Sequence, residues 1–121
     1  MFERILVTGA TGFLGHHIVP AIQAAFPRAN VIAVGRRDCD LLQPGAAERL
    51  LADVRPDAVV HLAAKSGGIE DNRLRPADYF YENLTMNTAT FHAEFRAGVK
   101  KFLTLMGGCS YPAKAASPIG E

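Results

Sequence analysis

Short apolar runs recur along the chain and are separated by longer stretches in which apolar residues return every three or four positions. The runs cover residues 5–7, 31–34, 58–62 and 102–106. Apolar runs of this length with little polar alternation are typical of strands buried on both faces of a parallel sheet. The pattern therefore predicts four parallel strands.

The stretches between the runs have the periodicity of helices. One stripe begins at Leu14 and stops at Pro27, a second follows Pro44, and a third begins after Pro76 and ends at Gly98, a glycine suited to a helix C-cap. Residues 65–75 are rich in glycine and charge and are predicted to form a loop. We predict that the apolar face of the third helix packs in the core; its members are Phe80, Leu84, Thr88, Phe91 and Phe95.

Strands that alternate with helices and short connections indicate the α/β class. We expect a Rossmann-type parallel sheet with helices on both faces, incomplete, in the strand order 3-2-1-4. At 121 residues the chain is one domain. Residues 1–121 are thus predicted to be the N-terminal part of a dinucleotide-binding domain, without a substrate domain.

Composition narrows the class of protein without choosing a function. The formal net charge is +1 and no basic run suggests a nucleic-acid partner. No apolar run approaches the roughly 18 residues of a membrane span. The two cysteines, Cys39 and Cys109, have neither disulfide-framework nor metal-ligand spacing, so no metal is expected and we predict a cytoplasmic protein.

The segment TGATGFLG, residues 8–15, lies between the first predicted strand and the first predicted helix. In this context Gly9, Gly12 and Gly15 permit a tight turn, a close approach of the backbone to a pyrophosphate, and close helix packing. The segment predicts a dinucleotide site. Thr11 is expected either to add a hydroxyl contact there or to cap the helix.

The end of the second strand bears on the choice of dinucleotide. A carboxylate at this point binds the ribose of NAD, whereas an arginine accommodates the 2′-phosphate of NADP. The chain has Arg36 and Arg37 here, which favour NADP, but Asp38 and Asp40 follow closely and leave NAD open. Solvated surface arginines are the alternative interpretation.

Three segments together, TGATGFLG, HLAAKSGG and GGCSYP, resemble the extended short-chain dehydrogenase/reductase family of NAD-dependent epimerases and dehydratases. The runs AAKSGGI, RPADYFYEN and GVKKFLTLMGGCSYP are most similar to its GDP-L-fucose synthase branch. The resemblance implies a nucleotide-sugar substrate, which is epimerised and then reduced by NADPH, and it leaves a homodimer open.

The resemblance also assigns individual residues. It implies that Cys109 is a catalytic acid/base in epimerisation, a role for which a thiol needs a lowered pKa. The residues it implies for cofactor binding, together with the threonine of the glycine segment, lie at the pyrophosphate, the adenosine end and the third strand: Gly9, Thr11, Gly12, Phe13, Leu14, Gly15, Arg36, Asp40, Leu41, Leu62, Ala63 and Ala64.

Two departures from the family pattern concern the reductive step. Gly107 stands where the family has a catalytic serine or threonine, and no tyrosine is followed by lysine at the Tyr-x-x-x-Lys spacing. We therefore expect the chain itself to be inactive. The alternatives are a non-catalytic nucleotide-binding or interaction module, or another nucleotide-sugar epimerase or dehydratase.

Three further polar residues are predicted near the site without a cofactor role. His61 is interpreted as structural, at the end of a strand. Lys65 is open between contact with a substrate phosphate and a solvated loop. Asn83 is expected to satisfy backbone groups where the long helix faces the sheet.

Overall fold

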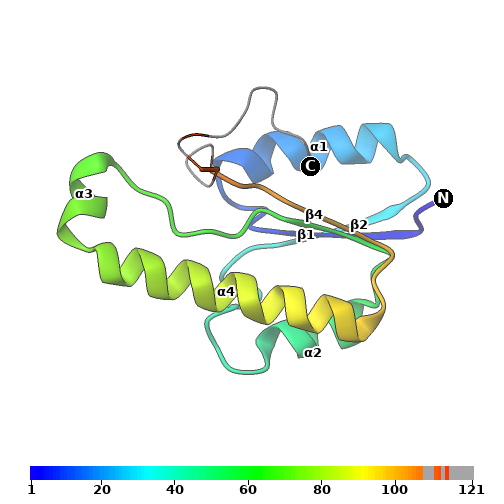
Figure 1. Ribbon diagram of the computed structural model, residues 1–121. Coiled ribbons are helices and arrows are strands. Elements are labelled where there is room, and N and C mark those ends of the chain that lie inside the picture. Colours follow the sequence, from blue (N-terminus) through cyan, green and yellow to red (C-terminus); the bar gives the residue numbers. More distant parts are fainter. Residues whose placement is uncertain (108–110, 113, 115–121) are drawn as a thin grey trace.

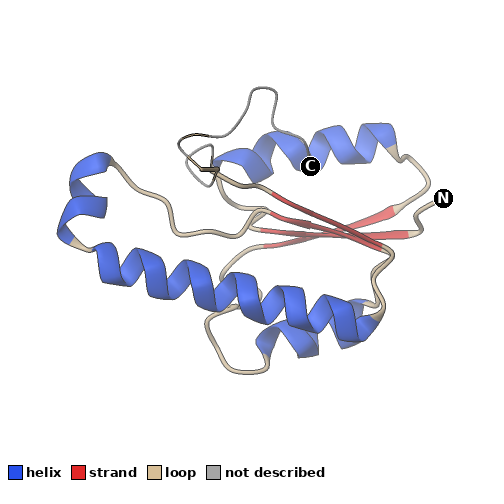
Figure 2. Cartoon of the chain, in the orientation of Figure 1, coloured by secondary structure: helices blue, strands red, loops and turns tan. Residues whose placement is uncertain are grey.

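The computed structural model describes residues 1–107, 111, 112 and 114. Four parallel strands form one sheet, and helices cover both of its faces (Figures 1 and 2). The α/β class and the Rossmann-like parallel sheet predicted from the sequence are confirmed. The elements in chain order are β1 (Arg4–Thr8), α1 (Phe13–Ala25), β2 (Asn30–Val34), α2 (Ala46–Val54), β3 (Ala58–His61), α3 (Ile69–Leu74), α4 (Pro76–Ala97) and β4 (Lys101–Thr104).

The predicted strand order 3-2-1-4 is wrong, because the sheet has the order β2-β1-β3-β4. The reason is the face on which α2 packs. α1 lies on one face, whereas α2 lies with α4 on the other (Figure 1). A right-handed crossover places its helix on opposite faces when the chain moves in opposite directions across the sheet. The chain therefore returns from β2 over β1, and β3 pairs with β1.

The centre of the sheet is fully buried, as the apolar runs predict. Leu6 and Val59 belong to the core between the sheet, α2 and α4, and Ile5, Val7 and Ala58 to the core under α1. Side chains on successive strand positions point to opposite faces, so an uninterrupted apolar run supplies both cores at once. This explains why β1 and β3 lack polar alternation.

The prediction that the Phe80–Phe95 stripe packs in the core is wrong. Phe80 is 70% exposed and Phe95 87%, while the side chains that α4 buries are Tyr79, Met86, Thr90, Ala93 and Glu94. Small side chains at 90 and 93 let α4 approach α2 and the sheet closely, whereas a row of phenylalanines would hold it away. Of the predicted stripe, Phe91 packs edge-on against Phe102 with ring centroids 4.4 Å apart.

Two local predictions are also corrected or refined. Residues 69–74, predicted as part of a loop, form the short helix α3, which projects beyond the sheet at the N-terminal end of α4 (Figure 1). The third predicted helix begins at Pro76, and Gly98 caps its C-terminus with a left-handed backbone conformation, as expected.

Among the described residues, none of the helices has both the length and the apolar character that crossing a membrane requires.

Candidate functional site

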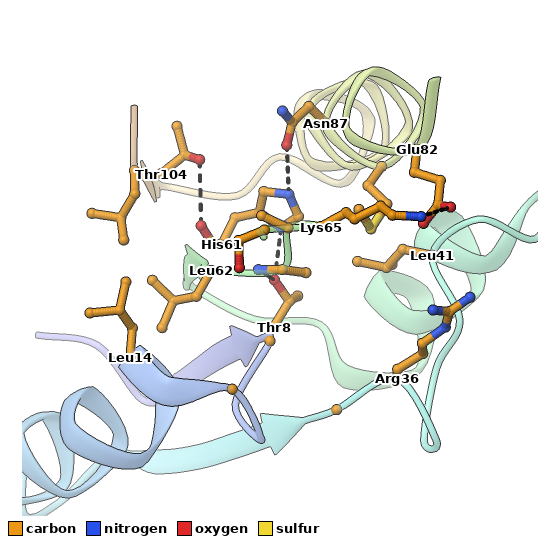
Figure 3. A pocket seen from close by; sticks show the side chains of 18 of the residues that line it. Thr8, Leu14, Arg36, Leu41, His61, Leu62, Lys65, Glu82, Asn87 and Thr104 are labelled. Atoms are coloured by element: carbon orange, nitrogen blue, oxygen red, sulfur yellow. Dashed lines mark hydrogen bonds and ion pairs between the residues drawn. The ribbon is translucent and has the colours of Figure 1, made fainter. Parts of the chain in front are cut away.

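A cleft of about 730 Å³ opens at the carboxyl ends of the strands. Its walls come from the loops after β1, β2 and β3, from the end of β4 and from the N-terminal half of α4 (Figure 3). This edge of an open parallel sheet, where neighbouring crossovers diverge, is where α/β proteins bind ligands. The volume is in the range of small-molecule and cofactor sites.

The loop after β1 is held tightly against the loop after β3. Gly9 has a φ of +68°, and a Cβ built on it would lie 2.5 Å from the backbone nitrogen of Ala63. The amide of Ala10 donates to the carbonyl of Val34, and the amide of Gly12 donates to that of Gly9. Glycine at position 9 is therefore required both by the left-handed turn and by the contact with β3.

The N-terminus of α1 faces the cleft, and no side chain among the described residues caps it. Gly12 is the N-cap and has no side chain to offer, and the first turn contains no acidic residue. Thr11 does not cap the helix, so that interpretation of Thr11 is wrong; it lines the cleft. The free amides of the first turn and the helix dipole make this position suited to an anion.

Gly15 has a different surrounding from the other two glycines of the segment. It is buried and does not line the cleft, and a Cβ built on it would lie 2.3 Å from the carbonyl oxygen of Ala10. By contrast, a Cβ at Gly12 would meet only the Gly9 carbonyl, at 3.3 Å. Gly15 thus permits close helix packing, while Gly12 leaves open space toward the cleft.

The β2 end of the cleft carries the charged residues that the sequence singled out. The Arg36 side chain is 73% exposed at the rim, and its Nε lies 3.9 Å from Asp40 Oδ1. Asp38 accepts the amide of Gly35, and Asp40 accepts the amide of Leu42. Both carboxylates therefore accept a hydrogen bond from the local backbone, while the largely exposed guanidinium, paired with Asp40, stands at the rim of the cleft.

The β3 end provides an apolar wall backed by a buried polar network. Leu62, Ala63 and Ala64 line the cleft directly after His61, which is 2% exposed. Burial lowers the pKa of His61, so its imidazole is neutral. His61 Nε2 lies 3.1 Å from Asn87 Oδ1 and donates to it; Nδ1 then accepts from the Thr8 hydroxyl, at 2.7 Å. The network joins β1, β3 and α4 beneath the cleft (Figure 3).

The loop after Ala64 is fastened to α4. Asn83 accepts the amide of Lys65 at 2.8 Å and donates to its carbonyl at 3.0 Å, which confirms the role predicted for Asn83. Lys65 Nζ forms an ion pair with Glu82 Oε1 at 2.6 Å and lies 5.4 Å from the ring centroid of Tyr79. Lys65 and Glu82 both line the cleft.

Residues 5–121 match the model of the NAD dependent epimerase/dehydratase family. The chain belongs to this family. It is 40% identical over 119 residues to GDP-L-fucose synthase of Sinorhizobium fredii and 32% identical to that of Escherichia coli, covering 98% of the chain and 37% of each relative. It also resembles a GDP-L-fucose synthetase from Naegleria fowleri solved bound to NADP, with a TM-score of 0.76 and 29% identity, covering 98% of this chain and 35% of that one.

The family membership agrees with where the structure brings the predicted residues. All the residues proposed for cofactor binding line the one cleft, except Gly15. Cys109 lies outside the described residues. Sequence reasoning did not place Glu82, Asn87 or Thr104 in the cleft, which all three line. They come from α4 and from the end of β4. Glu82 and Thr104 lie in segments that carry the family resemblance, but no local pattern of those segments places either side chain in the cleft.

Proposed function

We propose that this chain is the NADP-binding, N-terminal portion of a nucleotide-sugar epimerase/reductase of the GDP-L-fucose synthase type. The observation that carries the proposal is the arrangement of the cleft. The N-terminus of α1 lies at its centre, the exposed Arg36 lies at the β2 end, and the apolar wall of Leu62, Ala63 and Ala64 lies at the β3 end. A dinucleotide has a matching order of groups, with its pyrophosphate between the two nucleosides.

The residues present fit such a cofactor. The open space above Gly12 leaves room for the pyrophosphate near the amides of the first turn of α1. Arg36 and Leu41 would take the adenosine, and Leu62 to Ala64 would line the path toward the nicotinamide. When bound, the cofactor supplies hydride to a sugar ketone; the residues described here bind it and orient it.

NADP is favoured over NAD for an electrostatic reason. Asp38 and Asp40 are hydrogen-bonded to the backbone, while the Arg36 guanidinium is largely exposed at the rim. An arginine in this position pairs with a ribose 2′-phosphate, which NAD lacks. The Naegleria relative was solved bound to NADP, which supports the same choice.

Calorimetric titration of the chain with NADPH and NADH tests the proposal. We expect NADPH to bind more tightly than NADH, and Arg36→Ala to remove most of that preference, on the order of tenfold or more, because it deletes a charge-assisted contact. Arg28→Ala, which changes an exposed arginine outside the cleft, is the matched control. Binding of neither dinucleotide by the parent chain would contradict the proposal.

The substrate and the reacting residues rest on the relatives and on the resemblance. The relatives are GDP-L-fucose synthases, so we propose a GDP-linked 4-keto sugar as the substrate of the whole protein. The chain spans about two fifths of the length of these relatives.

For Cys109 we propose the acid/base role in epimerisation, because the GGCSYP segment resembles the corresponding segment of the family. The exposed apolar stripe of α4 supports a homodimer.

A further inference from the structure

Asn87 lines the cleft from α4 with an amide group whose two ends differ in their surroundings. Its oxygen Oδ1 lies 3.1 Å from His61 Nε2. Figure 3 shows the amide with its oxygen turned to His61 and its nitrogen turned away from it. Among the described residues, Nδ2 has no hydrogen-bond partner. The two protons on Nδ2 are therefore available to a molecule in the cleft.

We propose that Asn87 binds the ligand of this cleft, and that its Nδ2 donates a hydrogen bond to an acceptor-only oxygen of the dinucleotide, in a phosphate or the carboxamide. The inference rests on the proposed function. The glycine segment does not contain Asn87, and the residues that the family resemblance implies for cofactor binding do not include it.

The proton on His61 sets the orientation of the amide. Thr8 Oγ1 is buried, accepts the amide of Ala63 at 3.4 Å and lies 2.7 Å from His61 Nδ1. The proton of the Thr8 hydroxyl needs an acceptor, and Nδ1 is within reach, so the imidazole carries its own proton on Nε2. If the amide of Asn87 were turned over, its NH2 group would face this N–H, two donors with no acceptor between them.

The imidazole is itself held in place. His61 is 2% exposed, and its ring stacks on that of Phe102 with the centroids 6.2 Å apart. Burial lowers the pKa of His61, so the ring stays neutral and keeps Nδ1 as an acceptor. Asn87 therefore presents a donor that is oriented before a ligand binds, and a preorganised group loses little freedom on binding.

The kind of acceptor follows from the chemistry of the amide. With its oxygen occupied by His61, Asn87 offers the cleft two donors and no acceptor. Phosphate and carboxamide oxygens accept hydrogen bonds and do not donate them, and a dinucleotide carries both. The structural alternative is that Asn87 serves only to accept the proton of His61. In that case its oxygen matters and its NH2 group does not.

Asn87→Asp separates the two roles. Aspartate has the same shape and still accepts the proton of His61, but a second oxygen replaces the NH2 group. We expect NADPH to bind about tenfold more weakly or worse, since a hydrogen bond to the ligand becomes a contact between two acceptors. Calorimetric titration measures the affinity. The free energy of unfolding in urea should not fall, because the bond to His61 is retained and gains a charge.

Thr88→Asp is the matched control for the added charge. Thr88 is the next residue of α4, is exposed and does not line the cleft. Its carboxylate would be solvated and screened by salt, so NADPH affinity should change by about twofold at most. A difference between the two aspartate variants then reports the lost donor and not the charge.

The proposal is overturned if Asn87→Asp binds NADPH as tightly as the parent chain, if both aspartate variants weaken binding equally, or if affinity and stability fall together. NMR of the His61 ring nitrogens adds a readout on the parent chain: the proton should lie on Nε2, and a proton on Nδ1 would reverse the amide and overturn the inference. Binding of neither dinucleotide by the parent chain would overturn the proposed function as well, so the two failures are distinguishable.

Discussion

At the scale of single residues, glycine suits each of the three positions of the TGATGFLG segment for a separate physical reason. Gly9 is fixed by its positive φ and the nearby Ala63 backbone, Gly12 by open space toward the cleft, and Gly15 by the packing of α1 on the turn. The sequence motif predicted the three roles without assigning each to a position. The structure assigns the turn to Gly9, the open space to Gly12 and the helix packing to Gly15.

Gly15→Ala tests the packing role. The new methyl group would overlap the backbone of Ala10, so α1 must move away from the turn, and we expect a loss of about 1–3 kcal/mol in the free energy of unfolding. Urea unfolding measures it. Gly68→Ala is the matched control, because no atom lies within 4 Å of a Cβ built there and its φ is −68°. Equal losses in the two variants would contradict the assignment.

At the scale of elements, α4 buries a face that contains an unpaired glutamate. Glu94 is 4% exposed, and among the described residues its Oε1 has no hydrogen-bond partner. Burial raises the pKa of this carboxyl to about 8. The carboxyl group of Glu94 is therefore protonated in the folded protein at neutral pH.

Stability should depend on pH accordingly. The folded state retains a proton that the unfolded state releases above its pKa of 4.5, so the free energy of unfolding falls as pH rises from 4.5 to about 8. Glu94→Gln removes this dependence and should gain on the order of 2 kcal/mol over the parent across that range. Urea unfolding at several pH values measures it, with Glu48→Gln, an exposed position on α2, as the control. Parallel pH profiles for the parent and Glu94→Gln would refute the prediction.

At the scale of the whole molecule, Asp57 joins the beginnings of three strands opposite the cleft. Its Oδ2 accepts the amides of Glu3 and Arg4, its Oδ1 accepts Lys100 Nζ, and its carbonyl accepts the amides of Lys100 and Lys101. The hydrogen bonds from the Arg4 and Glu3 amides, and then that from Lys100, lower the pKa of Asp57 to about 2. This residue sets how β1, β3 and β4 start in register.

Asp57→Asn should destabilise the fold near neutral pH. The stabilisation from the ionised carboxylate is complete above the unfolded pKa of 3.8 and is lost as pH falls toward 2, so the difference between parent and variant should narrow over that interval. Thermal unfolding at a series of pH values measures it, and a drop of a few degrees at pH 7 is expected. Asp53→Asn, at an exposed position of α2, serves as the control. A difference that stays constant down to pH 2 would argue against the interpretation.

The sequence predicted the parts of the cleft that local rules govern. A glycine turn between a strand and a helix, and an arginine after β2, carry their meaning within a few residues, and they came together as expected. Glu82 and Asn87 were missed as cleft residues because they stand on a helix that follows another strand. Only the packing of α4 on the sheet brings them to the site.

The sequence by itself determined the α/β class, the strands, most of the helix ends and the composition of the glycine turn, since periodicity and turn chemistry act over short distances. Tertiary structure decided the strand order and the buried face of α4. Both depend on which helix faces fit closely together: α2 packs with α4, and Thr90 and Ala93 of α4 turn inward while Phe80 and Phe95 remain largely exposed. No single segment contains that information, because close packing is a property of surfaces that meet only in the folded chain.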